Sequence, residues 1–271
     1  MAQENIGGFI LDKRKVIYYQ DELNDEFSLA EITPRVIDGS YEYCKDSLWK
    51  KFTRFFWYRI VAMPIAYFYC KHKFHHKIIG AEKLKEFKKT GYFLYGNHTQ
   101  DIGDAFMPNL INPSKRKYIV VHPNNVSIPV IGPITPSLGA LPLPGDAVAH
   151  KNFARAIEKR YNENNGIVIY PEAHIWPFYT GIRPFGEAPF HYPVRLKAPT
   201  FCFTNTYQKR KGSDKPRIVT YVDGPFYPNP ELSIREQKID LRNQVYACMC
   251  ERAKLSTVEW IKYIKKETEN D

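Results

Sequence analysis

The stretch of the chain best suited to chemistry is residues 92–110, YFLYGNHTQDIGDAFMPNL. It predicts a buried strand and a tight turn, followed by His98, two aspartates (Asp101 and Asp104) and a helix. A neutral imidazole can accept a proton near pH 7, and a carboxylate bound to its other ring nitrogen fixes the tautomer and stabilises the imidazolium. No serine or cysteine lies beside this histidine in the sequence. We therefore expect His98 to act as a base directly on a substrate hydroxyl.

A second polar group follows another apolar run, GIVIYPEAHIWP at residues 166–177. Glu172 and His174 come directly after this expected strand. A carboxylate there can accept a hydrogen bond from a substrate, or it can hold the site together. Arg183 follows in TGIRPF, and a guanidinium can bind a phosphate through two parallel hydrogen bonds. The alternative is that Arg183 only pairs with a surface carboxylate, which contributes little.

These residues resemble, in chain order, the motifs of the glycerolipid acyltransferase family, whose members include lysophosphatidic acid (1-acylglycerol-3-phosphate) acyltransferases. The His98 stretch resembles N-H-x-x-x-x-D, in which the histidine deprotonates the acceptor hydroxyl for attack on an acyl thioester. The family aspartate lies five residues after the histidine, whereas Asp101 lies three and Asp104 six residues after His98. Matching DAFMPNL to the family's aspartate and apolar helix favours Asp104. Asp101 remains the alternative partner, or a cap for that helix.

The later motifs depart further from the family. YPEAHI resembles F-P-E-G-T-R and aligns Glu172 with the family glutamate, but Ile175 stands where the family arginine grips the acceptor phosphate. Residues 138–161 resemble the second motif, and Gly145 or Asp146 takes roughly the place of another phosphate-binding arginine. Both phosphate arginines are therefore absent, and basic residues nearby are candidates to replace them: Lys151, Arg155, His174 and Arg183.

The resemblance, which covers roughly residues 54–228, implies transfer of a fatty acyl group from acyl-CoA or acyl carrier protein to a lysolipid hydroxyl in phospholipid synthesis. Backbone N–H groups near the strand ends would stabilise the oxyanion. No metal or cofactor is implied. A cluster of Cys70, His72, His75 and His76 is not expected to bind metal, because alternation along a strand points the last two to opposite faces. Two alternatives stay open: acylation of a non-phosphate lipid acceptor, and a catalytically silent lipid-binding homologue.

The elements that must position these residues alternate along the chain. Apolar runs predict strands, and helical patterns fill several of the gaps, notably residues 146–164. We therefore expect an α/β fold with a mainly parallel or mixed central sheet flanked by helices. The apolar spacing at residues 233–269 predicts closing helices. The expected strands are residues 92–95, 118–121, 166–170, 200–204 and 217–222.

An aromatic, basic helical segment precedes this domain. Residues 50–70, KKFTRFFWYRIVAMPIAYFYC, are followed by the basic KHKFHHK. Their least interrupted apolar run is far shorter than the roughly 20 residues of a membrane-spanning helix. A helix lying in the lipid headgroup region is expected, with a helical hairpin packed on the main domain as the compatible alternative. The predicted division is an extension plus interfacial segment at 1–75, irregular over 1–46, and an acyltransferase domain at 76–271.

Composition narrows the partners. The 271 residues carry a formal charge of +10, which attracts phosphate groups. The basic residues form short clusters and no nucleic-acid motif, so nucleic acid is not expected as a partner, and an anionic membrane surface is. Five irregularly spaced cysteines and an N-terminus without a secretory pattern predict reduced thiols. We expect a cytoplasmic protein, peripheral on the inner face of the cell membrane.

Overall fold

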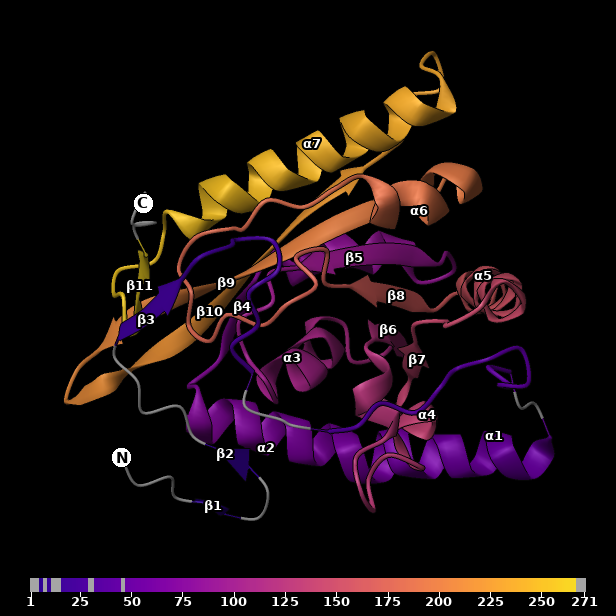
Figure 1. Ribbon diagram of the computed structural model, residues 1–271, viewed down its shortest axis with the longest axis horizontal. Helices are drawn as coiled ribbons and strands as arrows, with labels where there is room; N and C mark the ends of the chain where they lie inside the picture. Colours follow the sequence, from indigo (N-terminus) through magenta and orange to yellow (C-terminus); the bar gives the residue numbers. More distant parts are fainter. Residues whose placement is uncertain (1–4, 7–8, 11–15, 29–31, 45–46, 267–271) are drawn as a thin grey trace, which may run out of the picture.

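A seven-stranded mixed sheet forms the centre of the molecule in the computed structural model (Figure 1), which describes residues 5–6, 9–10, 16–28, 32–44 and 47–266. The strand order is β4-β10-β9-β5-β8-β6-β7. The five strands from β9 to β7 run parallel, β10 is antiparallel to β9, and β4 is parallel to β10. The strands are β4 (Lys77–Ile79), β5 (Tyr92–Gly96), β6 (Lys117–Val121), β7 (Ala140–Pro142), β8 (Gly166–Ile169), β9 (Thr200–Arg210) and β10 (Ser213–Phe226).

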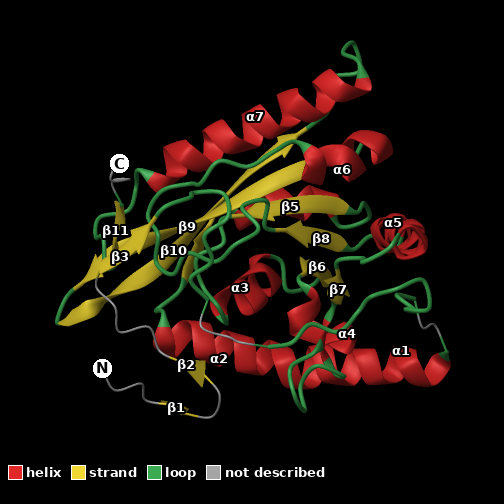
Figure 2. Ribbon diagram, viewed as in Figure 1, coloured by secondary structure: helices red, strands yellow, loops and turns green. Residues whose placement is uncertain are grey.

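Helices cover both faces of this sheet, as Figure 2 shows. Alternation along β5 explains the two layers: Phe93 and Tyr95 pack in one core with residues of α5, α6 and α7, while Tyr92 and Leu94 belong to a second core that includes Leu84 of η2. The α-helices are α1 (Leu48–Phe55), α2 (Met63–Lys73), α3 (Gly103–Ile111), α4 (Thr135–Leu138), α5 (Ala147–Asn162), α6 (His191–Leu196) and α7 (Ile234–Ala253). Four short helices complete the set: the π-helix η1 (Phe56–Ala62) and the 3-10 helices η2 (Ala81–Phe87), η3 (Pro123–Val126) and η4 (Ala188–Phe190).

The expected fold class is confirmed, and all five expected strands are present. The β9–β10 hairpin extends well beyond the apolar runs that predicted it. The apolar pattern misses the outer part of the hairpin because residues there, such as Lys209 and Lys211, are exposed and polar. Residues 233–269 are not helical throughout: α7 ends at Ala253, and β11 (Lys262–Lys265) forms a strand. Residues 267–269 of that prediction lie outside the described part of the chain.

The N-terminal part is more regular than expected. Strand β3 (Val16–Tyr19) pairs in parallel with β11, so the two ends of the chain form a small separate sheet. The short strands β1 (Asn5–Ile6) and β2 (Phe9–Ile10) pair antiparallel. The interpretation of residues 1–46 as irregular was therefore wrong for these strands.

The aromatic, basic segment forms consecutive helices, α1, η1 and α2, that lie end to end along one side of the molecule (Figure 1). Tyr58, Ala66 and Cys70 are buried against the domain. The opposite side exposes large apolar residues, namely Leu48, Trp49, Phe52, Phe55, Phe56, Ile60, Ile65, Tyr67 and Phe68. No helix in the described residues is both long and apolar enough to cross a membrane.

Candidate active site

The turn that carries His98 follows β5, a central strand between β8 and β9. Directly before it, Asn97 is buried and bonded twice to the neighbouring strand. Its Nδ2 donates to the Asn205 carbonyl oxygen at 3.0 Å, and its Oδ1 accepts from the Asn205 N–H at 2.8 Å. These bonds fix the chain direction at the carboxyl end of β5, where ligand sites of α/β sheets are usually found.

His98 and Asp104 form the predicted pair. Nδ1 of His98 lies 2.8 Å from Oδ2 of Asp104, which is 2% exposed on the first turn of α3. The same oxygen accepts the backbone N–H groups of Thr99 and Gln100, each at 2.9 Å. The structure thus places Asp104, the aspartate favoured by the match to the family's helix, against the imidazole. Asp101 is exposed, and the N-cap position of α3 is Ile102.

Tyr170 supports the same histidine from the end of β8. Its ring stacks on the imidazole, with centroids 4.4 Å apart and planes at 19°, and its hydroxyl donates to the Asp104 carbonyl at 2.6 Å. Tyr170 is not among the site residues predicted from the sequence, although its place beside Pro171 and Glu172 could have marked it. With Nδ1–H donating to Asp104, the neutral ring has its lone pair on Nε2. The His98 side chain is 18% exposed, so it can be reached from solvent.

Glu172 holds two loops together. It is 3% exposed; Oε2 accepts the His98 backbone N–H at 3.0 Å, and Oε1 accepts the Arg183 N–H at 3.1 Å. Burial raises the pKa of Glu172, while the Arg183 guanidinium and these N–H groups act in the opposite direction. Burial likewise raises the pKa of Asp104 against the effect of its three donors. Both carboxyl groups shape the loop that carries His98.

Arg183 does not extend into a cleft as a phosphate ligand would. It is 1% exposed and lies beside the Glu172 carboxylate, with NH2 3.5 Å from Oε2. Its guanidinium donates to the carbonyl oxygens of Glu22 and Glu172, each at 3.2 Å, and to that of His174. Neither of the two interpretations of Arg183 was correct, since its partner is a buried carboxylate and its donors bind backbone.

His174 also contacts the N-terminal segment. Its Nδ1 lies 3.2 Å from Oε2 of Glu26, and that carboxylate also accepts the Ile175 N–H. The Trp176 indole donates to the Asp25 carbonyl at 2.8 Å. Residues 22–27 therefore cover the loop that follows β8, a role that the sequence analysis missed.

The backbone donors beside His98 are occupied. The N–H groups of His98, Thr99 and Gln100 donate to Glu172 or Asp104. These three cannot also bind an oxyanion in this conformation. The expectation that N–H groups near the strand ends stabilise the oxyanion is therefore wrong for these three positions.

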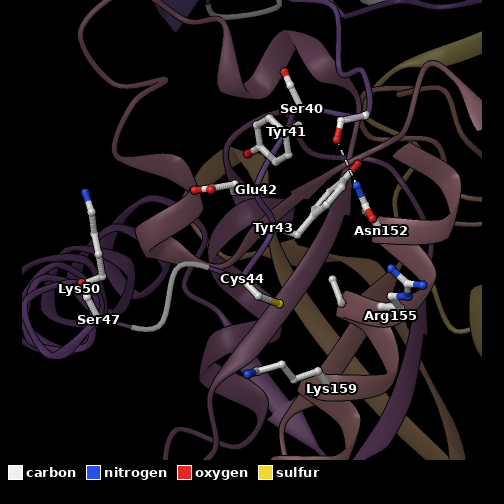
Figure 3. Close-up of a pocket in the computed structure, with 12 residues that line it drawn as sticks. Ser40, Tyr41, Glu42, Tyr43, Cys44, Ser47, Lys50, Asn152, Arg155 and Lys159 are labelled. Atoms are coloured by element: carbon white, nitrogen blue, oxygen red, sulfur yellow. Dashed lines mark hydrogen bonds between the residues drawn. The ribbon is translucent and has the colours of Figure 1, made fainter. Parts of the chain in front are cut away.

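A cavity of about 730 Å³ lies elsewhere, between residues 39–44, Ser47 and Lys50 on one side and α5 on the other (Figure 3). Lys50, Arg155 and Lys159 line it, so of the predicted site residues only Arg155, a candidate phosphate ligand, lies at this cavity. Lys151, also on α5, is exposed.

The sequence matches no protein-family model and no curated protein. Among solved structures, the chain is similar to "the 1-acyl-sn-glycerophosphate (LPA) acyltransferase, PlsC, from Thermotoga maritima". The TM-score is 0.52 at 13% sequence identity, and the match covers 78% of this chain and 89% of that chain. The two proteins share a fold. The α/β architecture of this chain is thus shared with that solved structure.

Proposed function

We propose that this protein is an O-acyltransferase that moves a fatty acyl group from an acyl thioester to a lipid hydroxyl. The single observation that carries the proposal is the His98–Asp104 contact of 2.8 Å at the carboxyl end of β5. The fold shared with an LPA acyltransferase supports the proposal. The order of the motifs along the chain, which is the order expected for that chemistry, supports it as well.

In the proposed reaction, Nε2 of His98 takes the proton of the acceptor hydroxyl while that oxygen attacks the thioester carbonyl. Asp104 keeps the Nδ1–H tautomer in place and stabilises the imidazolium that forms. Collapse of the tetrahedral intermediate breaks the carbon–sulfur bond, and the imidazolium returns its proton to the leaving thiolate. The products are an ester and a free thiol. The donor is acyl-CoA or acyl carrier protein.

The acceptor is proposed to be a lysolipid, in phospholipid synthesis. One observation favours a variant of this function: Arg183, a candidate to replace the phosphate arginines, is buried and bound to backbone carbonyls. Ile175, which stands where the F-P-E-G-T-R motif of the family has its arginine, is apolar. A lipid acceptor without a phosphate dianion, such as a glycolipid or a zwitterionic lipid, is therefore the second candidate.

We further propose that α1, η1 and α2 bind an anionic membrane surface. Nine exposed apolar side chains on this helical segment alternate with basic ones, including Lys50, Lys51 and Arg54. Aromatic rings favour the interfacial region of a bilayer, and cationic side chains are attracted by acidic headgroups. This arrangement fits a cytoplasmic protein that is peripheral on the inner face of the cell membrane.

The test is acylation of a mixture of lysolipids and glycolipids by the purified protein, with product detection by mass spectrometry. Acyl-CoA and acyl carrier protein are supplied in separate reactions. We expect an ester product with the parent protein and none with His98→Ala, which should remain folded by circular dichroism because His98 lies on a partly exposed turn. Turnover by folded His98→Ala would remove the base assignment. No product with any acceptor would favour a silent lipid-binding protein.

A further inference from the structure

A second chemical group lies between the sheet and α7, on residues for which the proposed reaction has no use. Cys202 of β9 and Asp223 of β10 are paired in the antiparallel register, so their side chains project to the same face of the sheet. Helix α7 crosses this face (Figure 1) and presents Cys248 and Arg252, one turn apart, toward it. Two thiols and a carboxylate thus meet at one helix–sheet contact.

The distances bring the thiols together. The sulfur atoms of Cys202 and Cys248 and a carboxylate oxygen of Asp223 lie within 4.8 Å of one another. Cys202 is fully buried, whereas Cys248 is half-buried and can be reached by a small reagent. All the described cysteines are free thiols.

The carboxylate is already neutralised. Arg252 donates to both oxygens of Asp223 at 2.7 and 2.8 Å, and the Lys83 ammonium lies 2.7 Å from Oδ1. A divalent cation bound by the two thiols and Asp223 would stand beside two fixed positive charges, which disfavours it. Arg252 also favours the thiolate form of Cys248, whereas the Asp223 carboxylate acts against it.

We propose that Cys248 and Cys202 form a thiol-oxidation site, in which a small peroxide oxidises Cys248 and Cys202 resolves the product as an intramolecular disulfide. The Cys248 thiolate attacks one oxygen of hydrogen peroxide; the sulfur–oxygen bond forms, the oxygen–oxygen bond breaks, and the departing hydroxide takes up the proton that the Cys248 thiol released, giving one molecule of water. Sulfur of Cys202 then attacks the Cys248 sulfenic acid, and its proton departs with the hydroxide as a second water. Overall, two thiols and one hydrogen peroxide give one disulfide and two waters.

The roles follow from the surroundings of each sulfur. A hydrogen bond from Cys202 lowers the pKa of the Cys248 thiol and outweighs burial and the Asp223 carboxylate, which raise it; Arg252 acts in the lowering direction. The pKa of Cys202 is raised, first by that hydrogen bond and then by burial. The accessible cysteine is therefore the nucleophile and the buried one the resolving thiol.

The helix supplies an internal control. Cys250 is also half-buried on α7, two residues further on, but burial raises the pKa of its thiol. It therefore lacks the thiolate character expected of Cys248. Cys250→Ser should leave the reaction at Cys248 unchanged.

The experiment treats the reduced, full-length protein with hydrogen peroxide and maps its peptides by mass spectrometry. We expect a Cys202–Cys248 cross-link that dithiothreitol reverses, formed roughly 10-fold faster than oxidation of Cys250. The Cys202→Ser variant should instead stop at a Cys248 sulfenic acid that dimedone traps.

Three results would overturn the proposal. One is oxidation of Cys248 and Cys250 at equal rates, and another is a Cys248 sulfinic acid without any cross-link in the parent protein. The third is protection of both thiols by Zn²⁺ alone, which would make the cluster a metal site. The peptide map of the parent protein decides the first two results even if Cys202→Ser does not fold.

Discussion

The His98 loop and the α1–α2 helical segment use polar and apolar residues in opposite ways. In the loop, Asp104 and Glu172 are buried and accept several hydrogen bonds, which fix the backbone around one partly exposed imidazole. On the helical segment, large side chains such as Trp49, 68% exposed, are open to solvent. The first arrangement fixes the geometry of the loop at a cost in folding stability, because buried charges are destabilising unless they are paired. The second arrangement leaves apolar surface exposed, and burial of that surface against a partner outside the protein would contribute free energy of binding.

The difference predicts separable consequences of mutation. Changes in the loop should alter turnover and folding, since its donors and acceptors are matched inside the protein. Changes on the exposed helical face should alter association with lipid and leave the free energy of unfolding nearly unchanged. The following experiments test that separation, beginning with the largest expected effect.

Replacing Asp104 by Asn should lower kcat by about 10³- to 10⁴-fold, because an amide can hold the imidazole in the wrong tautomer and cannot stabilise the imidazolium. The measurement is steady-state acyl transfer under the conditions that give product with the parent protein. Asp101→Asn is the matched control, three residues away but exposed, and should keep kcat near the parent value. A larger loss of kcat in Asp101→Asn than in Asp104→Asn would show that Asp101 is the catalytic partner of His98.

Replacing Arg183 by Ala should cost about 3–5 kcal/mol in the free energy of unfolding, because Glu172 would be left as a buried carboxyl group without its cation. Chemical denaturation measures the change. The control is Arg195→Ala, which breaks an exposed pair with Glu158 and should cost less than about 1 kcal/mol. If Arg183→Ala instead left stability intact and raised only the Michaelis constant for a phosphorylated acceptor, the phosphate role would be restored.

His76 should make stability depend on pH where α2 joins the sheet. Its Nε2 lies 2.7 Å from the Thr220 hydroxyl, and burial lowers the pKa of His76 to about 4. The unfolded chain, with a pKa near 6.5, binds the extra proton first as pH falls. Stability from this group is therefore full above about pH 6.5 and is lost toward pH 4, by about 3 kcal/mol.

The replacement His76→Gln should flatten the stability profile over that interval, as measured by urea unfolding at a series of pH values. His72→Gln changes an exposed histidine of α2 and should leave the slope as in the parent. Equal slopes for all three proteins would show that other groups carry the acid sensitivity.

The sequence predicts features that are set by residues close together in the chain, and it misses features that depend on contacts between residues far apart in the chain. The fold class and the His98–Asp104 pair come from local signals: apolar runs, and an aspartate in the first turn of the next helix. The environment of Arg183 depends on Glu22, and that of His174 on Glu26, each about 150 residues away in the chain. Nothing in the local spacing shows such contacts.

The same limit explains the errors in the fold. The helical spacing of Val258, Ile261 and Ile264 predicts a helix over residues 262–265, KYIK, but pairing with β3 makes them a strand. The polar outer part of the β9–β10 hairpin carries no apolar signal. In both places tertiary pairing decides the structure.

The smallest effect should come from the charges of the helical segment. Lys50 and Lys51 are exposed beside Trp49 and Phe52, and each lysine near an acidic surface contributes about 1 kcal/mol to binding, about 5-fold in affinity. Neutralising both to Gln should weaken binding to phosphatidylserine-containing vesicles by that factor for each lysine. The parent's binding should also fall as salt rises, since ions screen charge over about 10 Å at 0.1 M.

The matched control removes the same charge from the tip of the β9–β10 hairpin, with Lys209 and Lys211 both changed to Gln. Vesicle sedimentation at low and high salt should separate the two double variants, while their free energies of unfolding stay equal to the parent's. Equal weakening by both pairs would mean that net charge, and not this helical face, attracts the vesicle. Binding that neither salt nor the Lys50 and Lys51 changes reduce would leave insertion of the exposed rings as the sole anchor, because apolar burial does not depend on charge screening.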